Sequence, residues 1–493
     1  MKVEYIDTTF RDGSQSLWAA GMPPGMMEEM ADNLDNAGFK VIEVPVMPLN
    51  FKKIVRDLKE DPWEMAKMLA RKMPNTTKSF MGEPAIFPFE IIGAPESVVK
   101  LFYKKLVDIG VLNRVQIMAN IIGNIDEKYP WYIPFLRSQN LEVALAIAYT
   151  VSPRHTDEYY AEKTREIAAM KPDTIYLKDA GGLLTVDRIR TLLPLMLENS
   201  NGIPVEVHSH CTTGLAEVVY LEALKLGARA LHTSVPPLAE GSGQPSVLNV
   251  VRNAKFLGFE HDLDIERIEW ASQRLYEMAR QDDMPLGSAT SYDHSQYIYQ
   301  IPGGVISNLK HQLVALNLQD RIDEVLEETV RVREELGYPV MITPYSQFVV
   351  SQAAINVATG KRYKMVIDEI IQFAMGTFSE DSGYTWMDQN LKDKILSLPR
   401  VKQIPSAPDT TISIEKIREQ FGGPTLSDEE FLLRYIMKGT QEIEELRRNS
   451  SPRKYISAST PLAKLIQNIS KQPNLKNVQI NGTDFALTLA SKK

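Results

Sequence analysis

Residues 174–210 decide the fold, and they read TIYLKDAGGLLTVDRIRTLLPLMLENSNGIPVEVHSH. An apolar run suited to a β-strand stands near each end, Thr174–Lys178 and Val205–His208. The segment between them is long enough for a helix, so the stretch predicts a strand–helix–strand unit. Strands that alternate with helices favour a parallel sheet, because each helix returns the chain to the edge where the next strand starts.

The same alternation extends over roughly the first 240 residues. Helix-length segments such as Gly25–Ala37 and Thr156–Met170 separate most of the apolar runs. Eight strand–helix units predict an α/β protein with a closed (β/α)8 TIM barrel. The expected strands are Val3–Asp7, Val41–Val44, Thr77–Phe80, Arg114–Met118, Leu141–Tyr149, Thr174–Lys178, Val205–His208 and Ala228–Thr233.

After about residue 260 the pattern becomes helical. We predict a barrel domain over residues 1–300, a mainly helical domain over 301–440 and a small extension over 441–493. A turn-rich stretch near Pro399–Pro408 resembles a linker, and Asn477–Leu489 alternates like a hairpin around Asn481-Gly482. The expected helices are Asp264–Arg280, Ile306–Leu316, Arg321–Leu336 and Tyr345–Ala358.

Composition excludes several classes of protein. The chain has 493 residues, of which 55 are basic and 63 acidic, so its formal net charge is −8. This balance does not predict the basic surface that binds nucleic acid. Nowhere do about 18 consecutive apolar residues occur, so we expect no membrane span. Cys211 is the one cysteine, which excludes an intrachain disulfide and, with a start that lacks a signal peptide, favours the cytoplasm.

Barrel enzymes place their active sites at the carboxyl ends of the strands. His208 and His210 are two apart on an expected strand, so both side chains point to the same face. Asp12 follows the first strand and is predicted on the same rim. Two imidazoles and a carboxylate make a divalent-metal site, although the histidines could instead be satisfied by ordinary neighbours.

Lys178 has three interpretations at this rim. It could form a salt bridge, for example with Asp179, act as a Schiff-base lysine, or be carbamylated by CO2 and so become an anionic ligand. Arg11 and Asp12 could simply pair with each other, and Gln15 could bond to backbone. We interpret Cys211 as a plain buried residue, since no separate base is evident for it.

Together these motifs resemble the carboxyltransferase domain shared by pyruvate carboxylase, the transcarboxylase 5S subunit and the oxaloacetate decarboxylase alpha subunit. The resemblance covers roughly residues 3–440. The motifs that carry it are Asp7–Ser16, Glu60–Glu64, Met73–Thr76, Lys178–Leu184, His208–His210, Gly243–Ser246, Ile301–Gly304 with Asn308-Leu309, and Thr343–Ser346.

The resemblance implies a role for each motif. Asp12, His208, His210 and a carbamylated Lys178 would bind zinc, manganese or cobalt. Thr343 would shuttle a proton between biotin and substrate, and Thr343 and Ser346 would contact the biotin. Arg11 and Gln15 would orient the substrate. The later helices would form a funnel-type domain through which carboxybiotin reaches the metal.

Two departures from the family concern the acceptor. The family's Gly-Gly-Ala-Thr stretch is replaced by Val46–Phe51, and the arginine-glycine pair of pyruvate-using members is missing from Phe80–Glu83. An arginine that grips a carboxylate is not replaceable by methionine. We therefore expect an acceptor other than pyruvate, or one held differently. After Thr343-Pro344, the usual Ser-Ser-Lys becomes Tyr345-Ser346-Gln347, which changes the surroundings of the threonine.

The chain lacks the Ala-Met-Lys-Met motif at which biotin is attached. If biotin is used, we expect it on a separate carrier protein, with that carrier and a biotin carboxylase as partners and a homodimer as the assembly. The leading interpretation is the carboxyltransferase component of a multi-subunit biotin-dependent carboxylase or decarboxylase. The alternatives are a biotin-independent, metal-dependent lyase or aldolase acting on a 2-oxo acid or acyl substrate, a Schiff-base aldolase, and a scaffold subunit without catalysis.

Overall fold

The computed structural model divides into two units, Met1–Pro452 and Arg453–Lys493. In the second unit, β9 (Asn477–Asn481) pairs with β10 (Ala486–Ala490) in antiparallel register, which confirms the predicted hairpin. The structure describes residues 2–84, 94–123, 125–302, 319–404, 411–450, 452–455, 477–481 and 486–490, and the single residues Val305, Leu309, Leu313, Leu465 and Ile469.

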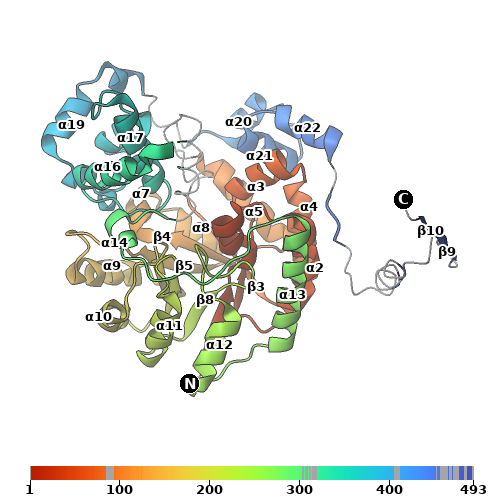
Figure 1. The fold of residues 1–493 in the computed structure, drawn as a ribbon. Helices are drawn as coiled ribbons and strands as arrows, with labels where there is room; N and C mark the ends of the chain where they lie inside the picture. The colour runs from red at the N-terminus through yellow and green to blue at the C-terminus, as the bar shows by residue number, and fades with distance from the viewer. Residues whose placement is uncertain are drawn as a thin grey trace. The chain divides into compact units, whose positions relative to one another are not determined.

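Parallel strands form the centre of the first unit. They close a barrel in the order β1-β2-β3-β4-β5-β6-β7-β8 (Figure 1), which confirms the predicted TIM barrel. Most of the strand residues are buried, because barrel strands pack side chains both inward and outward against the helices. The strands are β1 (Glu4–Asp7), β2 (Val41–Glu43), β3 (Thr77–Met81), β4 (Arg114–Met118), β5 (Glu142–Ala148), β6 (Thr174–Asp179), β7 (Val205–Ser209) and β8 (Ala230–Thr233).

Helices surround the barrel and begin where the sequence offers capping groups. The Thr156 side chain accepts from the backbone N–H of Tyr159, and Thr185 accepts from Arg188 in the same way. These contacts satisfy N–H groups that a helix start otherwise leaves unpaired. The main helices here are α2 (Pro24–Asp35), α3 (Pro48–Lys53), α4 (Pro62–Lys72), α5 (Glu96–Ile109), α8 (Tyr132–Ser138), α9 (Asp157–Ala169), α10 (Val186–Asn199), α11 (Ala216–Lys225), α12 (Val247–Phe256) and α13 (Ile265–Gln281).

A further group of helices lies beside the barrel (Figure 1). The Arg154 guanidinium joins the two parts, since it donates to the carbonyls of Gly337 at 2.7 Å and Asp381 at 3.1 Å. The predicted helix Ile306–Leu316 falls mostly outside the described residues. The group contains α14 (Ser295–Tyr299), α16 (Ile322–Glu335), α17 (Tyr345–Thr359), α18 (Asp368–Ala374) and α19 (Gln389–Leu396), and the predicted linker begins as a short 3₁₀ helix, Pro399–Gln403.

The later helices α20 (Ile414–Gln420), α21 (Asp428–Met437) and α22 (Gln441–Asn449) return to the barrel (Figure 1). α21 contacts α3 and α5. The Trp63 indole of α4 donates to the carbonyl of Glu429 at 3.0 Å. Within the described residues, none of the helices is both long and apolar enough to cross a bilayer.

A Leu432→Ala substitution tests how firmly α21 is attached. Leu432 is fully buried, so its truncation leaves a cavity and should lower the free energy of unfolding by about 2–5 kcal/mol. Chemical denaturation followed by circular dichroism measures this change. Leu396→Ala, at a leucine that is 37% exposed, is the control and should cost much less; equal effects would mean that α21 is not part of the core.

Candidate metal centre at the mouth of the barrel

Three strands deliver the predicted ligands to one end of the barrel. Asp12 lies in a π-helical turn, Thr9–Gly13, directly after β1. Lys178 is the fifth residue of β6, and its register partner on β7 is His208. His210 follows the end of β7. Because all these positions are at carboxyl ends of parallel strands, their side chains meet at the mouth where barrel enzymes act.

The predicted ligand atoms converge closely. The Asp12 carboxylate lies 3.5 Å from His208 Nε2 and 3.8 Å from His210 Nε2, and the two Nε2 atoms are 3.1 Å apart. Tetrahedral coordination at 2.0–2.1 Å separates ligand atoms by about 3.3 Å. Within the described residues, Asp12, His208 and His210 form a group that could hold a metal ion. The donor set and its spacing fit a divalent cation.

Charge accumulates around Asp12. Lys178 Nζ lies 3.2 Å from its carboxylate, and Arg11 Nη2 lies 2.9 Å from it. Burial acts to raise the pKa of Asp12, but the Arg11 and Lys178 cations outweigh burial and hold that pKa well below its usual range. Burial is also the main reason why the pKa of Lys178 is lowered. Asp12 is therefore an anion, and Lys178 an amine that sheds its proton more easily than usual.

Ser242 orients the His210 ring, and Gln244 contacts both histidines. His210 Nδ1 lies 2.6 Å from the Ser242 carbonyl, which can only accept, so this nitrogen carries the proton and Nε2 is bare. The Gln244 amide lies 3.0 Å from His210 Nε2 and 3.3 Å from His208 Nε2. Gln244 stands in the Gly243–Ser246 motif, but no role was predicted for it from the sequence.

Beneath the ligands, the barrel interior holds a layer of buried charges that was not predicted from the sequence. Arg11 donates through Nε to Glu43 at 2.8 Å, and Gln116 donates to the same carboxylate at 2.8 Å. Arg114 pairs with Glu206 through both terminal nitrogens, at 3.1 and 2.6 Å. The sequence did contain a signal for this layer, because polar residues stand at alternate, inward-facing positions of strands that are otherwise apolar.

The structure distributes the predicted substrate and biotin residues around this mouth. Gln15 is half-buried in α1 (Ser14–Trp18), one turn beyond Asp12. Thr343 is half-buried and precedes a cis proline. Ser346 is fully buried in the first turn of α17, and its hydroxyl has no hydrogen-bond partner within the described part of the chain. Their contacts with substrate and biotin stay predictions.

An apolar cluster places the Thr343 segment over the barrel. Val340 packs with Met118 and Tyr176, and Ile342 lies against the same cluster. Tyr176 is two residues before Lys178 on β6, so the chain just before Thr343 lies at the end of the barrel that carries the predicted ligands. Met81, at the position where the family's arginine is missing, also packs here.

Two interpretations from the sequence are resolved by the contacts. Lys178 pairs with Asp12 and not with Asp179, whose carboxylate accepts from the backbone N–H groups of Leu183 and Leu184 at 2.8 Å each. Cys211 is buried as expected. Burial raises the pKa of its thiol well above the ordinary value, which makes it a poor nucleophile.

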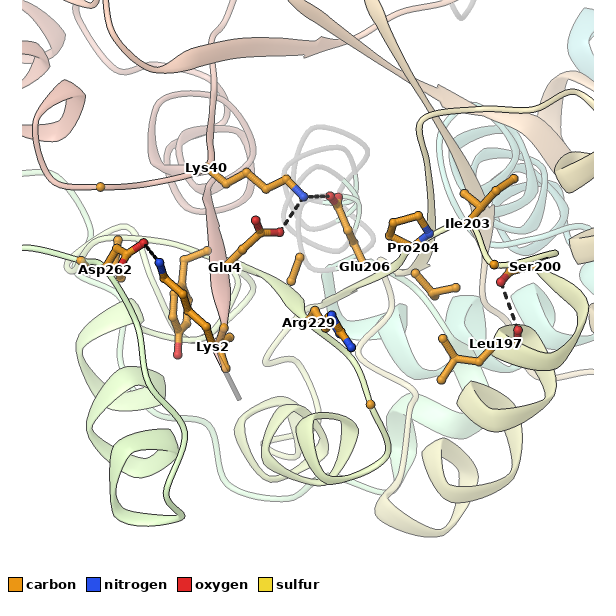
Figure 2. A pocket seen from close by; sticks show the side chains of 18 residues that line it. Lys2, Glu4, Lys40, Leu197, Ser200, Ile203, Pro204, Glu206, Arg229 and Asp262 are labelled. Carbon is orange, nitrogen blue, oxygen red and sulfur yellow. Dashed lines mark hydrogen bonds and ion pairs between the residues drawn. The ribbon is translucent and has the colours of Figure 1, made fainter.

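A pocket opens at the opposite, amino-terminal end of the barrel (Figure 2). Its lining includes Lys40, whose ammonium lies 2.7 Å from Glu4 and 3.7 Å from Glu206. None of the predicted site residues lines this pocket. Barrel enzymes act at the other end, so the candidate metal centre, and not this pocket, lies where the chemistry is expected.

Comparison with known proteins agrees with the barrel fold. Residues 297–484 match the family described as conserved carboxylase domain, and residues 124–275 match the HMGL-like family. The carboxyl transferase domain of Rhizobium etli pyruvate carboxylase has the same fold, with a TM-score of 0.77 and 22% identity over 90% of this chain and 76% of that chain.

Relatives of similar sequence carry related names. The chain is 33% identical to a pyruvate carboxylase subunit from Methanocaldococcus jannaschii over 77% of its own length and 66% of the relative's. It is 30% identical to the 2-oxoglutarate carboxylase large subunit of Hydrogenobacter thermophilus, with coverages of 80% and 60%. The methylmalonyl-CoA carboxyltransferase 5S subunit of Propionibacterium freudenreichii is 28% identical, with coverages of 76% and 74%. The chain thus spans less than two thirds of the length of the first two relatives. These matches confirm the predicted resemblance, and the chain belongs to the carboxyltransferase family of enzymes that includes these carboxylase subunits.

Proposed function

We propose that this chain is the carboxyltransferase component of a multi-subunit biotin-dependent carboxylase or decarboxylase. The observation that carries the proposal is the convergence of Asp12, His208 and His210, beside Lys178, at the mouth of the barrel. Carboxylation next to a carbonyl passes through an enolate. A divalent cation held by these residues would act as a Lewis acid that stabilises the negative oxygen.

Lys178 would complete the ligand set as a carbamate. Its neutral amine would add CO2 and release a proton, which converts a cation that repels metal into an anionic oxygen donor. The position of Nζ, 3.2 Å from Asp12, supports this role. Zinc, manganese and cobalt all suit a set of imidazole and carboxylate-type ligands.

The proton and the substrate would be handled by the predicted residues of the mouth. The Thr343 hydroxyl would pass the proton from the acceptor carbon to the biotin nitrogen as the carboxyl group moves in the opposite direction. A positioned proton donor contributes roughly 10²–10⁴-fold in rate. Gln15 and Arg11 would orient the acceptor's carbonyl and carboxylate, and Ser346 would help to hold the biotin.

The acceptor we propose is small and other than pyruvate. Met81 supports this because it stands where pyruvate-using members of the family carry an arginine, and it packs against an apolar cluster that contains Met118 and Tyr176. The relatives' names leave the choice open, since they include both a pyruvate and a 2-oxoglutarate carboxylase.

A Met81→Arg variant tests this assignment. Wild-type turnover of pyruvate and oxaloacetate should lie near background. The arginine would offer a charge-assisted hydrogen bond worth about 1.5–3 kcal/mol, so kcat/KM for pyruvate should rise about tenfold or more. Met81→Leu, which keeps the apolar cluster, should not change it. Robust turnover of pyruvate by the wild-type chain would contradict the proposal.

Biotin would arrive on a separate carrier protein, loaded by a biotin carboxylase subunit, and the family likeness points to a homodimer.

The runner-up is a biotin-independent, metal-dependent lyase or aldolase, which the match of residues 124–275 to the HMGL-like family favours. Avidin separates the two. Transfer of labelled bicarbonate to a panel of 2-oxo acids, in a system reconstituted with carrier and carboxylase, should be blocked by avidin, whereas activity that persists in avidin supports the lyase.

A further inference from the structure

The two histidines of the metal centre are oriented by different kinds of neighbour. The Ser242 carbonyl beside His210 Nδ1 can only accept a hydrogen bond, so the proton position on His210 is determined directly. His208 Nδ1 instead lies 3.2 Å from Nδ1 of a third ring, His232. A neutral imidazole has one donor and one acceptor nitrogen, so His232 alone does not determine which of the two nitrogens carries the proton.

Glu206 removes this ambiguity. Its Oε2 lies 3.1 Å from His232 Nε2, and both carboxylate oxygens are paired with Arg114. A carboxylate in such a two-pronged ion pair is an acceptor, so His232 Nε2 must donate to it. With both rings neutral, His232 Nδ1 is then bare and accepts from His208 Nδ1, which leaves His208 Nε2 without a proton and facing Asp12 and His210.

Burial and geometry hold this chain of contacts in place. Glu206, His232 and His208 are each at most 1% exposed in their side chains. His232 stacks on Tyr176, with the ring planes 17° apart. At the far end, the Glu206 carboxylate faces Lys40 across the pocket at the amino-terminal end of the barrel (Figure 2). The three residues therefore link the two ends of the barrel interior.

We propose that Glu206 and His232 are positioning residues that keep the proton of His208 on Nδ1 and so present its Nε2 to a divalent metal. The inference rests on the proposed metal centre. Residues that orient a metal-binding histidine typically change metal affinity by about 10–100-fold when they are replaced. Glu206 and His232 would thus contribute to metal affinity without touching the ion.

The test compares Co²⁺ affinity and the Co²⁺ absorption spectrum in wild-type and variant chains. His232→Leu removes the acceptor and should weaken Co²⁺ binding about 10–100-fold. His232→Gln should retain most of the affinity, because its amide can donate to Glu206 and accept from His208. If His232 only filled space, leucine would be tolerated better than glutamine. His155→Leu, at a histidine that is also buried but bonds to Ser152, is the matched control and should leave Co²⁺ binding unchanged.

Glu206→Gln provides a second variant, because the side-chain amide can donate to His232 Nε2. His232 Nδ1 would then donate to His208 instead of accepting from it, which moves the His208 proton to Nε2. This variant should also weaken Co²⁺ binding. A measurement on the wild-type chain keeps the test valid if a variant does not fold. Nitrogen NMR of ¹⁵N-histidine-labelled chain without metal should show the His208 proton on Nδ1, and a proton on Nε2 would overturn the proposal.

The outcomes separate this inference from the proposed function. A wild-type chain that binds no Co²⁺ would refute the metal centre and, with it, the positioning role of Glu206 and His232. Normal Co²⁺ binding by the wild type and by folded His232→Leu and Glu206→Gln variants would refute the positioning role of Glu206 and His232 but not the metal centre.

Discussion

A His210→Ala chain is expected to lose its bound divalent metal and at least about a thousandfold in carboxyl transfer. His210 Nε2 lies 3.1 Å from His208 Nε2 and faces Asp12, so its removal leaves two of the three clustered donors. A metal acting as a Lewis acid contributes several kcal/mol to transition-state stabilisation, and each 1.4 kcal/mol is a factor of ten in rate. Elemental analysis and the reconstituted transfer assay measure the two effects.

The next residue along the chain supplies the control for this variant. Cys211 is buried beside His210 but belongs to no ligand group among the described residues. Cys211→Ala should keep both the metal and the activity. A His210→Ala chain that retains wild-type metal content, or loss of metal in Cys211→Ala, would contradict the ligand assignment.

The second large effect is expected in stability. Arg114 and Glu206 form an ion pair in which both side chains are 1% exposed. Arg114→Met leaves the Glu206 carboxylate buried without its guanidinium, which should lower the free energy of unfolding by about 3–5 kcal/mol. Chemical denaturation at neutral pH measures the loss.

A double variant tells whether the unpaired charge is the cause. Arg114→Met combined with Glu206→Leu removes both charges and should recover a large part of the lost stability, because a buried pair can often be replaced by apolar groups. Arg190→Met breaks the pair with Glu222, in which Arg190 is 52% exposed, and should cost at most about 1 kcal/mol. An Arg114→Met chain as stable as Arg190→Met would refute the argument.

The barrel could be predicted because its signal is local. Each of the eight apolar runs that were expected to form strands in the first 240 residues supplied a strand. Prediction erred mainly at the ends, where Leu141–Tyr149 became Glu142–Ala148 and Ala228–Thr233 became Ala230–Thr233. Strand ends depend on hydrogen bonds to neighbouring strands, which the pattern of one segment does not contain.

The convergence of Asp12, Lys178, His208 and His210 could be predicted because these residues stand at or just after strand ends and include a pair spaced by two residues. Their partners could not, because contacts such as Lys178 with Asp12 join residues 166 apart in sequence. The sequence suggested the adjacent Asp179 instead. His232 and Glu206 were missed for the same reason, since a lone polar residue on an apolar strand does not show which residue it faces. The attachment of α21 to α3 and α5 was equally hidden.

Metal content and intact mass, measured on the chain purified without chelators in buffer that contains CO2, test the central claim most directly. The account predicts about one divalent ion per chain and an added carbamate mass on the intact chain that is lost in acid. A chain with no bound metal after such a purification would contradict the account, and the Schiff-base and scaffold interpretations would then take its place.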